Sequence, residues 1–372
     1  MRVGPDDGLG HGTTGPCRYR QARGGGRNRG TVAILTVAGS TELVVGHGLP
    51  DDILPVRAGR QRVAVMTQPG ATQIALDVAQ RLRGNGLQVE VIGLPDRDEA
   101  KTLAVAESVY EALARFGFGR HDTVVGVGGG SVTDLAGFVA GTWLRGVEVV
   151  HVPTTLLAAV DAAIGGKTGV NLAGKNLVGL FWHPTRVVVD VGILGRLPGS
   201  LRREGLAEAL KAGIVGDPEL FELLATHGED SELEEVVTRA AAVKARVVGE
   251  DERESGVRAT LNFGHTIGHA IEFASPLSHG ECVAVGMVAA GRISERRLRF
   301  PAFQRMVEAI AGLGLPIRVD GLDRARVEDL LRHDKKRDAE GLRMVLLRAL
   351  GDPVVEHVDD VDLETGLGAV GL

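Results

Sequence analysis

Short apolar runs alternate with helix-periodic segments through the first half of the chain. Residues 31–45 hold two β-branched runs separated by Gly39 and Ser40, a pattern that predicts a hairpin or strand pair. Further strands are predicted at residues 62–67, 87–93, 122–127, 147–152 and 186–190, and helices at 71–83, at 99–116 and from about Asp134. Because strands that alternate with helices form parallel βαβ crossovers, this half predicts an α/β domain that binds ligands beyond the carboxyl ends of its strands.

The pattern changes after residue 196. From residue 197 onward, β-branched runs give way to long stretches of Ala, Leu, Glu and Arg with helical spacing, and Pro198 and Gly199 mark the junction. We therefore expect an α/β domain over residues 31–196 and a mostly helical domain over 197–372. Residues 1–30 are rich in Gly and Arg with almost no apolar periodicity, so burial cannot offset their ordering entropy. They predict a disordered N-terminal extension.

Composition excludes several classes of protein. At 372 residues the chain is long enough for two domains, and its net charge of -6 argues against a general nucleic-acid binder. Cys17 and Cys282 are the only cysteines, so we expect neither a disulfide framework nor a cysteine-based zinc site, and a reducing cytoplasm fits. No apolar run has the length of a membrane span, and the N-terminus lacks a continuous apolar segment, so neither membrane insertion nor export is expected.

Residues 261–281 gather three histidines, an asparagine and two carboxylates. On a helix His265 and His269 lie four residues apart on one face, and His279 follows a short break that contains Pro276. Three imidazoles, or two and a carboxylate, with an open fourth position form a catalytic zinc site. The alternative is that one or two of these histidines are structural, but their clustering favours a metal. The HExxH order of metalloproteases is absent, which disfavours a protease.

Two glycine-rich segments of the α/β half are candidates for binding phosphate. The turn at residues 128–131 (GGGS) joins a predicted strand to a helix, where free N–H groups can meet an anion, although a purely structural turn is the alternative. Residues 160–176 carry Asp161, Lys167, Lys175 and Asn176 among small residues. Lysines on such loops commonly contact phosphates, and a solvated surface loop is the alternative.

The helical half adds charged residues of its own. Glu208 and Lys211 lie three apart on one face of a helix predicted over residues 205–215. Such a pair usually lies on the surface, but its apolar flanks leave open a buried pair that completes the metal site. Further cations are Lys244, Arg258 and the DKKR run at residues 334–337, which is by default solvated. A metal beside a nicotinamide cofactor indicates oxidation of a hydroxyl, with the metal polarising the developing carbonyl. The many Lys and Arg side chains favour a substrate that carries phosphate and carboxylate groups.

Several segments together resemble the 3-dehydroquinate synthases, within the wider sugar-phosphate cyclases. In the family's order they are GGGSVTDLAGF, TWLRGV, VPTTLLAAVDAAIGGKTGVN, GKNLVG, GLAEALK, LNFGHTIGHAIE, HGE and DKK, and they span residues from about 40 to about 350. The resemblance implies a Rossmann-like NAD-binding domain followed by a helical metal- and substrate-binding domain. It also implies a cytoplasmic phosphorus–oxygen lyase of the shikimate pathway, homodimeric, with NAD and zinc, or alternatively cobalt, as cofactors.

The resemblance further implies roles for individual residues. The zinc ligands would be Glu208, His265 and His279, so that His269 becomes a substrate-side residue. The catalytic residues would be Lys167, Lys211, Lys244, Arg258, Asn262 and His269, and further substrate contacts Arg145, Asp161, Asn176, Lys335 and Lys336. NAD would lie against Asp96, Asp98, Lys101, Gly128, Gly129, Gly130, Ser131, Val132, Thr133, Asp134, Thr154, Thr155, Lys167, Lys175, Ile193, Leu194, Gly195 and Arg196.

The implied reaction converts 3-deoxy-D-arabino-heptulosonate 7-phosphate to 3-dehydroquinate and phosphate. The C5 hydroxyl is oxidised with NAD, phosphate leaves by β-elimination, the ketone is reduced again, and an intramolecular aldol step closes the ring. The chain departs from the family in a shorter Lys167–Lys175 loop, a shorter loop before His279, and the residues Asp98 and Arg196. The alternatives are a sister cyclase of secondary metabolism, of the aminodehydroquinate or valiolone type, and a polyol dehydrogenase that releases NADH.

Overall fold

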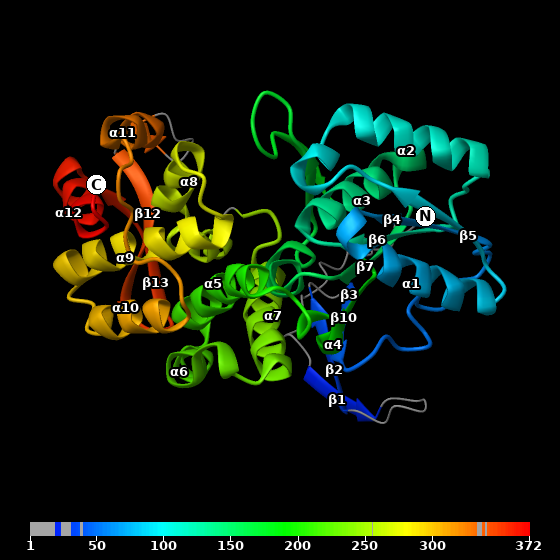
Figure 1. Cartoon of the computed structure of the whole chain (residues 1–372), viewed down its shortest axis with the longest axis horizontal. Helices are drawn as coiled ribbons and strands as arrows, with labels where there is room; N and C mark the ends of the chain where they lie inside the picture. The colour runs from blue at the N-terminus through cyan, green and yellow to red at the C-terminus, as the bar shows by residue number, and fades with distance from the viewer. Residues whose placement is uncertain (1–18, 24–30, 38–39, 255, 333–336, 339–340) are drawn as a thin grey trace, which may run out of the picture.

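The computed structural model describes residues 19–23, 31–37, 40–254, 256–332, 337–338 and 341–372. An eight-stranded sheet and its helices form one end of the molecule, and a helical assembly forms the other (Figure 1). Helices α5 (Gly199–Gly216) and α7 (Leu233–Glu250) lie between the two ends (Figure 1). No helix within these ranges is long and apolar enough to cross a membrane.

The large sheet has the strand order β1-β2-β3-β10-β7-β6-β4-β5. All pairings from β3 to β5 are parallel, whereas β1 and β2 add antiparallel pairs at the β3 edge. The strands are β1 (Tyr19–Arg23), β2 (Thr31–Val37), β3 (Thr41–Gly46), β4 (Arg62–Thr67), β5 (Gln88–Gly93), β6 (Thr123–Gly128), β7 (Glu148–Pro153) and β10 (Arg186–Asp190). The predicted hairpin and the predicted alternation of strands and helices are therefore confirmed.

Helices cover both faces of this sheet because its central strands are apolar on both sides. Along β4, Val63 and Val65 face α1 (Thr72–Gly84), whereas Ala64 and Met66 face α2 (Leu103–Phe116) and α3 (Gly130–Thr142). Helix α3 begins at Gly130, earlier than the predicted start near Asp134, because the glycine turn itself forms the first helical turn. The carboxyl ends of β6 and β7 thus open directly onto this turn.

The N-terminal segment differs from our expectation at one place. We predicted residues 1–30 to be disordered, but Tyr19–Arg23 forms β1, which pairs with β2 in an antiparallel ladder. A ladder is held by backbone hydrogen bonds and does not require apolar periodicity, which is why the sequence pattern missed it. Residues 1–18 and 24–30 lie outside the described part of the chain.

The helical half is arranged around α9 (His279–Leu298), which packs against α5, α8 and α12 and against β12 (Gly341–Ala349). The other helices are α6 (Pro218–His227), α8 (His265–Ala274), α10 (Phe303–Gly312), α11 (Arg324–Arg332) and α12 (Asp360–Ala369). One hydrophobic core runs from these helices through α5 and α7 into β2, β3 and β10, so the two halves share a continuous packed interior.

Two small sheets were not predicted from the sequence. Strands β12 and β13 (Asp352–Val358) form an antiparallel hairpin, extended by β11 (Arg337–Asp338), inside the half that we expected to be mostly helical. Strands β8 (Lys167–Val170) and β9 (Val178–Phe181) form a second hairpin, and the loop between them carries Lys175 and Asn176. This second hairpin presents the lysine loop to the functional site.

Candidate active site

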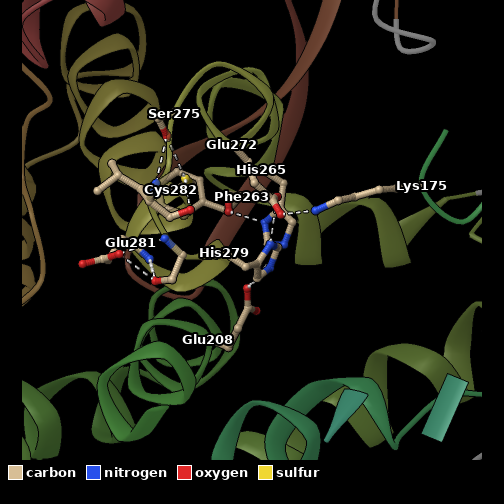
Figure 2. Close-up of polar contacts among 11 residues, drawn as sticks. Lys175, Glu208, Phe263, His265, Glu272, Ser275, His279, Glu281 and Cys282 are labelled. Atoms are coloured by element: carbon tan, nitrogen blue, oxygen red, sulfur yellow. Dashed lines mark hydrogen bonds and ion pairs between the residues drawn. The ribbon is translucent and has the colours of Figure 1, made fainter. Parts of the chain in front are cut away.

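Three residues that are far apart in the sequence meet at the junction of α5, α8 and α9. Glu208 comes from the middle of α5, while His265 and His279 are the first residues of α8 and α9. Gly264, with a φ of 77°, provides the left-handed turn before α8, and Ser278 starts α9 with a capping box. Because both histidines are the first residues of their helices, their imidazoles point toward Glu208. The Nε2 atoms of His265 and His279 lie 3.3 and 3.4 Å from Glu208 Oε1 (Figure 2).

The set Glu208, His265 and His279 fits a divalent metal ion. One ligand atom from each residue lies within 4.8 Å of the others, and a carboxylate with two imidazoles is a catalytic zinc donor set. Glu208 is 2% exposed, and neither of its side-chain oxygens makes a hydrogen bond within the described part of the chain. Its oxygens have only ion-pair contacts with Lys211 and the two imidazoles, and a bound cation would give this buried carboxylate a direct ligand.

The second ring nitrogen of each imidazole is also held in place. His265 Nδ1 lies 3.2 Å from the carbonyl oxygen of Phe263, and His279 Nδ1 lies 3.2 Å from Glu272 Oε2. Burial, aided by the Lys211 charge, lowers the pKa of His265, which favours the neutral imidazole that a metal requires. Burial opposes charge on His279, but Glu208 and Glu272 outweigh it and raise its pKa to about 10, so metal binding there would release a proton.

His269, our local candidate for a third imidazole ligand, lies beside the same cluster. Its ring centre is 5.2 Å from that of His265 and 5.9 Å from that of His279. His269, Glu272 and His279 form a second set with ligand-like spacing. The first set holds the buried carboxylate of Glu208 and the buried His265, whereas all three members of the second set are half-buried, and this favours Glu208 over His269 as the third ligand.

A polar pocket opens next to this cluster. It is lined by Asp161, Lys167, Lys211, Lys244, Glu254, Arg258, Leu261, Asn262 and His265. Four of these side chains are cationic and two are carboxylates, so the lining favours an anionic ligand. The pocket brings together all of the expected catalytic residues except His269, which lies beside it in the imidazole cluster.

Glu208 and Lys211 form a buried ion pair and do not lie on the surface, where such a pair is usually found. Lys211 is 3% exposed, and its ammonium group contacts Glu208 Oε2. Burial opposes charge on Lys211, but Glu208 and Asp161 raise its pKa. Lys244 contacts Asp161, yet desolvation and the neighbouring Lys211 charge lower the pKa of Lys244, so the pKa values of the two lysines are shifted in opposite directions.

Glu254 is a pocket residue that the sequence did not reveal. Its carboxylate contacts Lys167 Nζ and accepts a hydrogen bond of 2.7 Å from Asn262 Nδ2. The nearby Arg258 guanidinium is buried and donates at 2.9 Å to the carbonyl oxygen of Gly165. Glu254 thus holds two of the expected catalytic residues, but in the sequence it stands in an acidic and basic run (GEDERE) that is typical of a solvated surface.

The expected cofactor residues gather at the carboxyl ends of β6 and β7. Lys101 Nζ lies 2.6 Å from Asp134 Oδ2 and donates at 2.5 Å to Asn176 Oδ1, and Ser131 Oγ donates at 2.9 Å to Asp98 Oδ1. The turn itself needs glycine, because a Cβ on Gly128 would lie 2.4 Å from Val132 Cγ2. The backbone N–H of Thr154 donates to the Gly128 carbonyl oxygen at 2.9 Å, which fixes the neighbouring strand end.

The remaining expected residues lie at several separate places. Ile193, Leu194, Gly195 and Arg196 follow β10 in and just after α4 (Val191–Leu194), and Gly129, Gly130, Val132, Thr133 and Thr155 belong to α3 or to the two strand ends. Lys175 lies 2.6 Å from Glu272 of α8, and Asp96 is exposed beside Arg97. Arg145, with a φ of 66°, does not line the pocket described above, and Lys335 and Lys336 lie outside the described residues.

Comparison with known proteins accounts for this arrangement. The family model for the 3-dehydroquinate synthase N-terminal part matches residues 91–204, and that for the C-terminal part matches residues 205–337. The chain is 43% identical over 322 residues to a 3-dehydroquinate synthase of Mycobacterium leprae, and the alignment covers 84% of this chain and 89% of that relative. The chain belongs to the 3-dehydroquinate synthase family.

Solved structures of other cyclases have a similar fold. A 2-deoxy-scyllo-inosose synthase complexed with carbaglucose-6-phosphate, NAD+ and Co2+ is 27% identical with a TM-score of 0.80, covering 95% of this chain and all of that one. A 2-epi-5-epi-valiolone synthase from Streptomyces hygroscopicus, with NAD+ and Zn2+ bound, is 28% identical with a TM-score of 0.77, covering 84% of this chain and 91% of that one. The expected α/β half followed by a mostly helical half is the fold that these cyclases share.

Proposed function

We propose that this enzyme, a phosphorus–oxygen lyase, converts 3-deoxy-D-arabino-heptulosonate 7-phosphate to 3-dehydroquinate and phosphate. The observation that carries the proposal is the buried set of Glu208, His265 and His279 directly beside a pocket with four cationic side chains. Relatives named 3-dehydroquinate synthase that are 40–43% identical over most of the chain support it. The reaction places it in the shikimate pathway and in the biosynthesis of aromatic amino acids.

NAD and a divalent metal are the cofactors, as in the two solved cyclases described above. When bound, they supply reversible hydride transfer and polarisation of the hydroxyl that is oxidised. Glu208, His265 and His279 would hold the metal, zinc or alternatively cobalt. NAD would lie at the glycine turn of residues 128–131, where Asp98, Lys101 and Asp134 already form a polar network.

The side chains of the pocket bind and orient the substrate. Lys167, Lys211, Lys244 and Arg258 supply the positive charge that a substrate with phosphate and carboxylate groups needs. Asp161 and Glu254 hold two of these ammonium groups in place before the substrate enters. The side chains of Lys211 and Lys244 are only 4% and 12% exposed, so their charges meet the substrate where little water competes for them.

Further assignments belong to the same proposal. His269, Asn262 and Asn176 would contact the substrate, and Arg145, Lys335 and Lys336 would do so from outside the described pocket. We divide the chain into a cofactor domain over residues 31–196 and a metal and substrate domain over residues 197–372. We also propose a cytoplasmic protein that binds neither nucleic acid nor membrane, which the acidic net charge and the scarcity of cysteine support. That it is a homodimer is proposed from the family resemblance alone.

Substrate preference tests this function against the sister cyclases. The metal-loaded enzyme with NAD is offered the heptulosonate 7-phosphate and, separately, a heptulose 7-phosphate that lacks the carboxylate. Because the cationic pocket is built for both anionic groups, we expect kcat/KM to favour the carboxylated sugar by at least about 100-fold. The reverse preference would contradict the proposal and indicate a valiolone-type cyclase.

A further inference from the structure

Glu272 links the metal set to the cofactor half. It lies on α8 seven residues after His265 and therefore on the same face of the helix. Its side chain is 16% exposed, and its two carboxylate oxygens have different partners. Figure 2 shows it between Lys175 and His279, with Glu208 on the other side of the His279 ring.

The contact with His279 decides which ring nitrogen faces the metal set. Glu272 Oε2 lies 3.2 Å from His279 Nδ1, while His279 Nε2 points at Glu208 Oε1. A carboxylate at Nδ1 keeps the proton on that nitrogen and leaves the Nε2 lone pair available as a ligand. Carboxylates in this position behind a histidine ligand typically change metal affinity by about 10–100-fold when removed.

The other oxygen of Glu272 reaches across to the β8–β9 loop. Lys175 Nζ donates to Glu272 Oε1 at 2.6 Å, and the same ammonium lies 6.0 Å from the Phe273 ring centre. The neighbouring Asn176 accepts from Lys101 in the cofactor network. One carboxylate therefore joins a metal-side histidine of the helical half to a loop anchored in the cofactor half.

We propose that Glu272 is a positioning residue: it fixes the tautomer and orientation of His279 for metal binding and anchors the Lys175 loop beside it. This inference rests on the metal site proposed above. Glu272 does not itself bind the metal, which separates this assignment from the alternative ligand set of His269, Glu272 and His279.

Zinc affinity tests this inference without reference to turnover. Apoprotein of the wild type, Glu272→Ala and Glu272→Gln is titrated with Zn2+ against a chromophoric chelator. We expect Glu272→Ala to weaken zinc binding by about 10–100-fold. Glu272→Gln, which keeps an oxygen to accept from Nδ1–H, should restore affinity to within a few-fold of the wild type. The matched control is Glu295→Ala, which removes a half-exposed carboxylate from α9 and should leave zinc affinity unchanged.

A second readout distinguishes positioning from simple loss of charge. The visible absorption spectrum of the Co2+-substituted protein reports ligand geometry, and it should change in Glu272→Ala but not in Glu272→Gln. Wild-type zinc affinity and an unchanged cobalt spectrum in Glu272→Ala would overturn the inference, and so would equal weakening by Ala and Gln. If Glu208→Ala leaves zinc binding intact, the metal does not use Glu208, and the proposed site fails instead.

Discussion

The spacing between α8 and α9 should control both stability and metal binding, and Gly286 is the position that tests this. Gly286 lies on α9 two turns after His279 and faces the start of α8. A Cβ there would lie 2.0 Å from the Gly264 carbonyl oxygen and 2.7 Å from Gly268 N. Both are backbone atoms, which cannot rotate away as a side chain could. Since Cβ contacts below 3.0 Å essentially never occur, Gly286→Ala must move the two helices apart by about 1 Å.

The energetic cost follows from two opposing effects. Overpacking a rigid interior costs about 1–3 kcal/mol. The upper end applies here because the added Cβ would clash with backbone atoms. The Gly-to-Ala change itself returns up to about 1 kcal/mol of helix propensity. We expect a net loss of about 2 kcal/mol. Because Gly264 immediately precedes His265, the same displacement should also weaken zinc binding by at least about tenfold.

Thermal unfolding and zinc titration, run on the same preparations, measure both effects. Gly312→Ala is the matched control, since a Cβ at this position near the end of α10 meets no described atom within 4 Å. That control should unfold at the wild-type temperature or slightly above it and bind zinc normally. Wild-type stability together with wild-type zinc affinity in Gly286→Ala would refute the idea that close helix packing sets the metal site.

Three further outcomes follow from the site and the sheet. Glu208→Gln should weaken zinc binding by more than the roughly 10–100-fold expected when a residue that only contacts a ligand is removed, and its circular dichroism spectrum should not change. Retained zinc affinity would exclude Glu208 as a ligand. Treatment with a chelator should abolish turnover, and added Zn2+ or Co2+ should restore it; turnover that survives metal removal would contradict metal dependence. Burial lowers the pKa of His151 in β7 to about 3, so the folded protein stays neutral there while the unfolded chain takes up a proton below its ordinary pKa of 6.5. His151 should thus cost the fold about 2 kcal/mol between pH 7 and pH 5, and the urea-unfolding difference between wild type and His151→Leu should change with pH by that amount; a constant difference would refute it.

Much of the fold was predictable because its signals are local. The strands β4, β6, β7 and β10 are short apolar runs bounded by turns, and a buried parallel sheet demands that pattern. The hairpin of β12 and β13 was missed although it is rich in Val and Leu, because charged residues interrupt it and the surrounding sequence is helical. Short apolar runs of this kind do not separate strand from helix by periodicity alone.

The candidate site was less predictable because its contacts are distant in sequence. The spacing of Glu208 and Lys211 shows that they share a helix face, but only the packing of α5 against α7 and α9 shows that this face is buried. Glu254 meets Lys167, 87 residues away, and Glu272 meets Lys175, 97 residues away. An acidic residue in a charged run or on an amphipathic helix carries no local sign of such a partner.

The measurement that bears most directly on the proposed reaction is its stoichiometry with NAD far below the substrate concentration. Zinc-loaded enzyme is given heptulosonate 7-phosphate, and phosphate, 3-dehydroquinate and absorbance at 340 nm are followed together. We predict phosphate and dehydroquinate in equal amounts, many turnovers for each NAD, and no lasting NADH, because the hydride returns within the same site. Product formation that stops when the NAD is consumed, with NADH accumulating in step, would contradict the account and indicate a dehydrogenase.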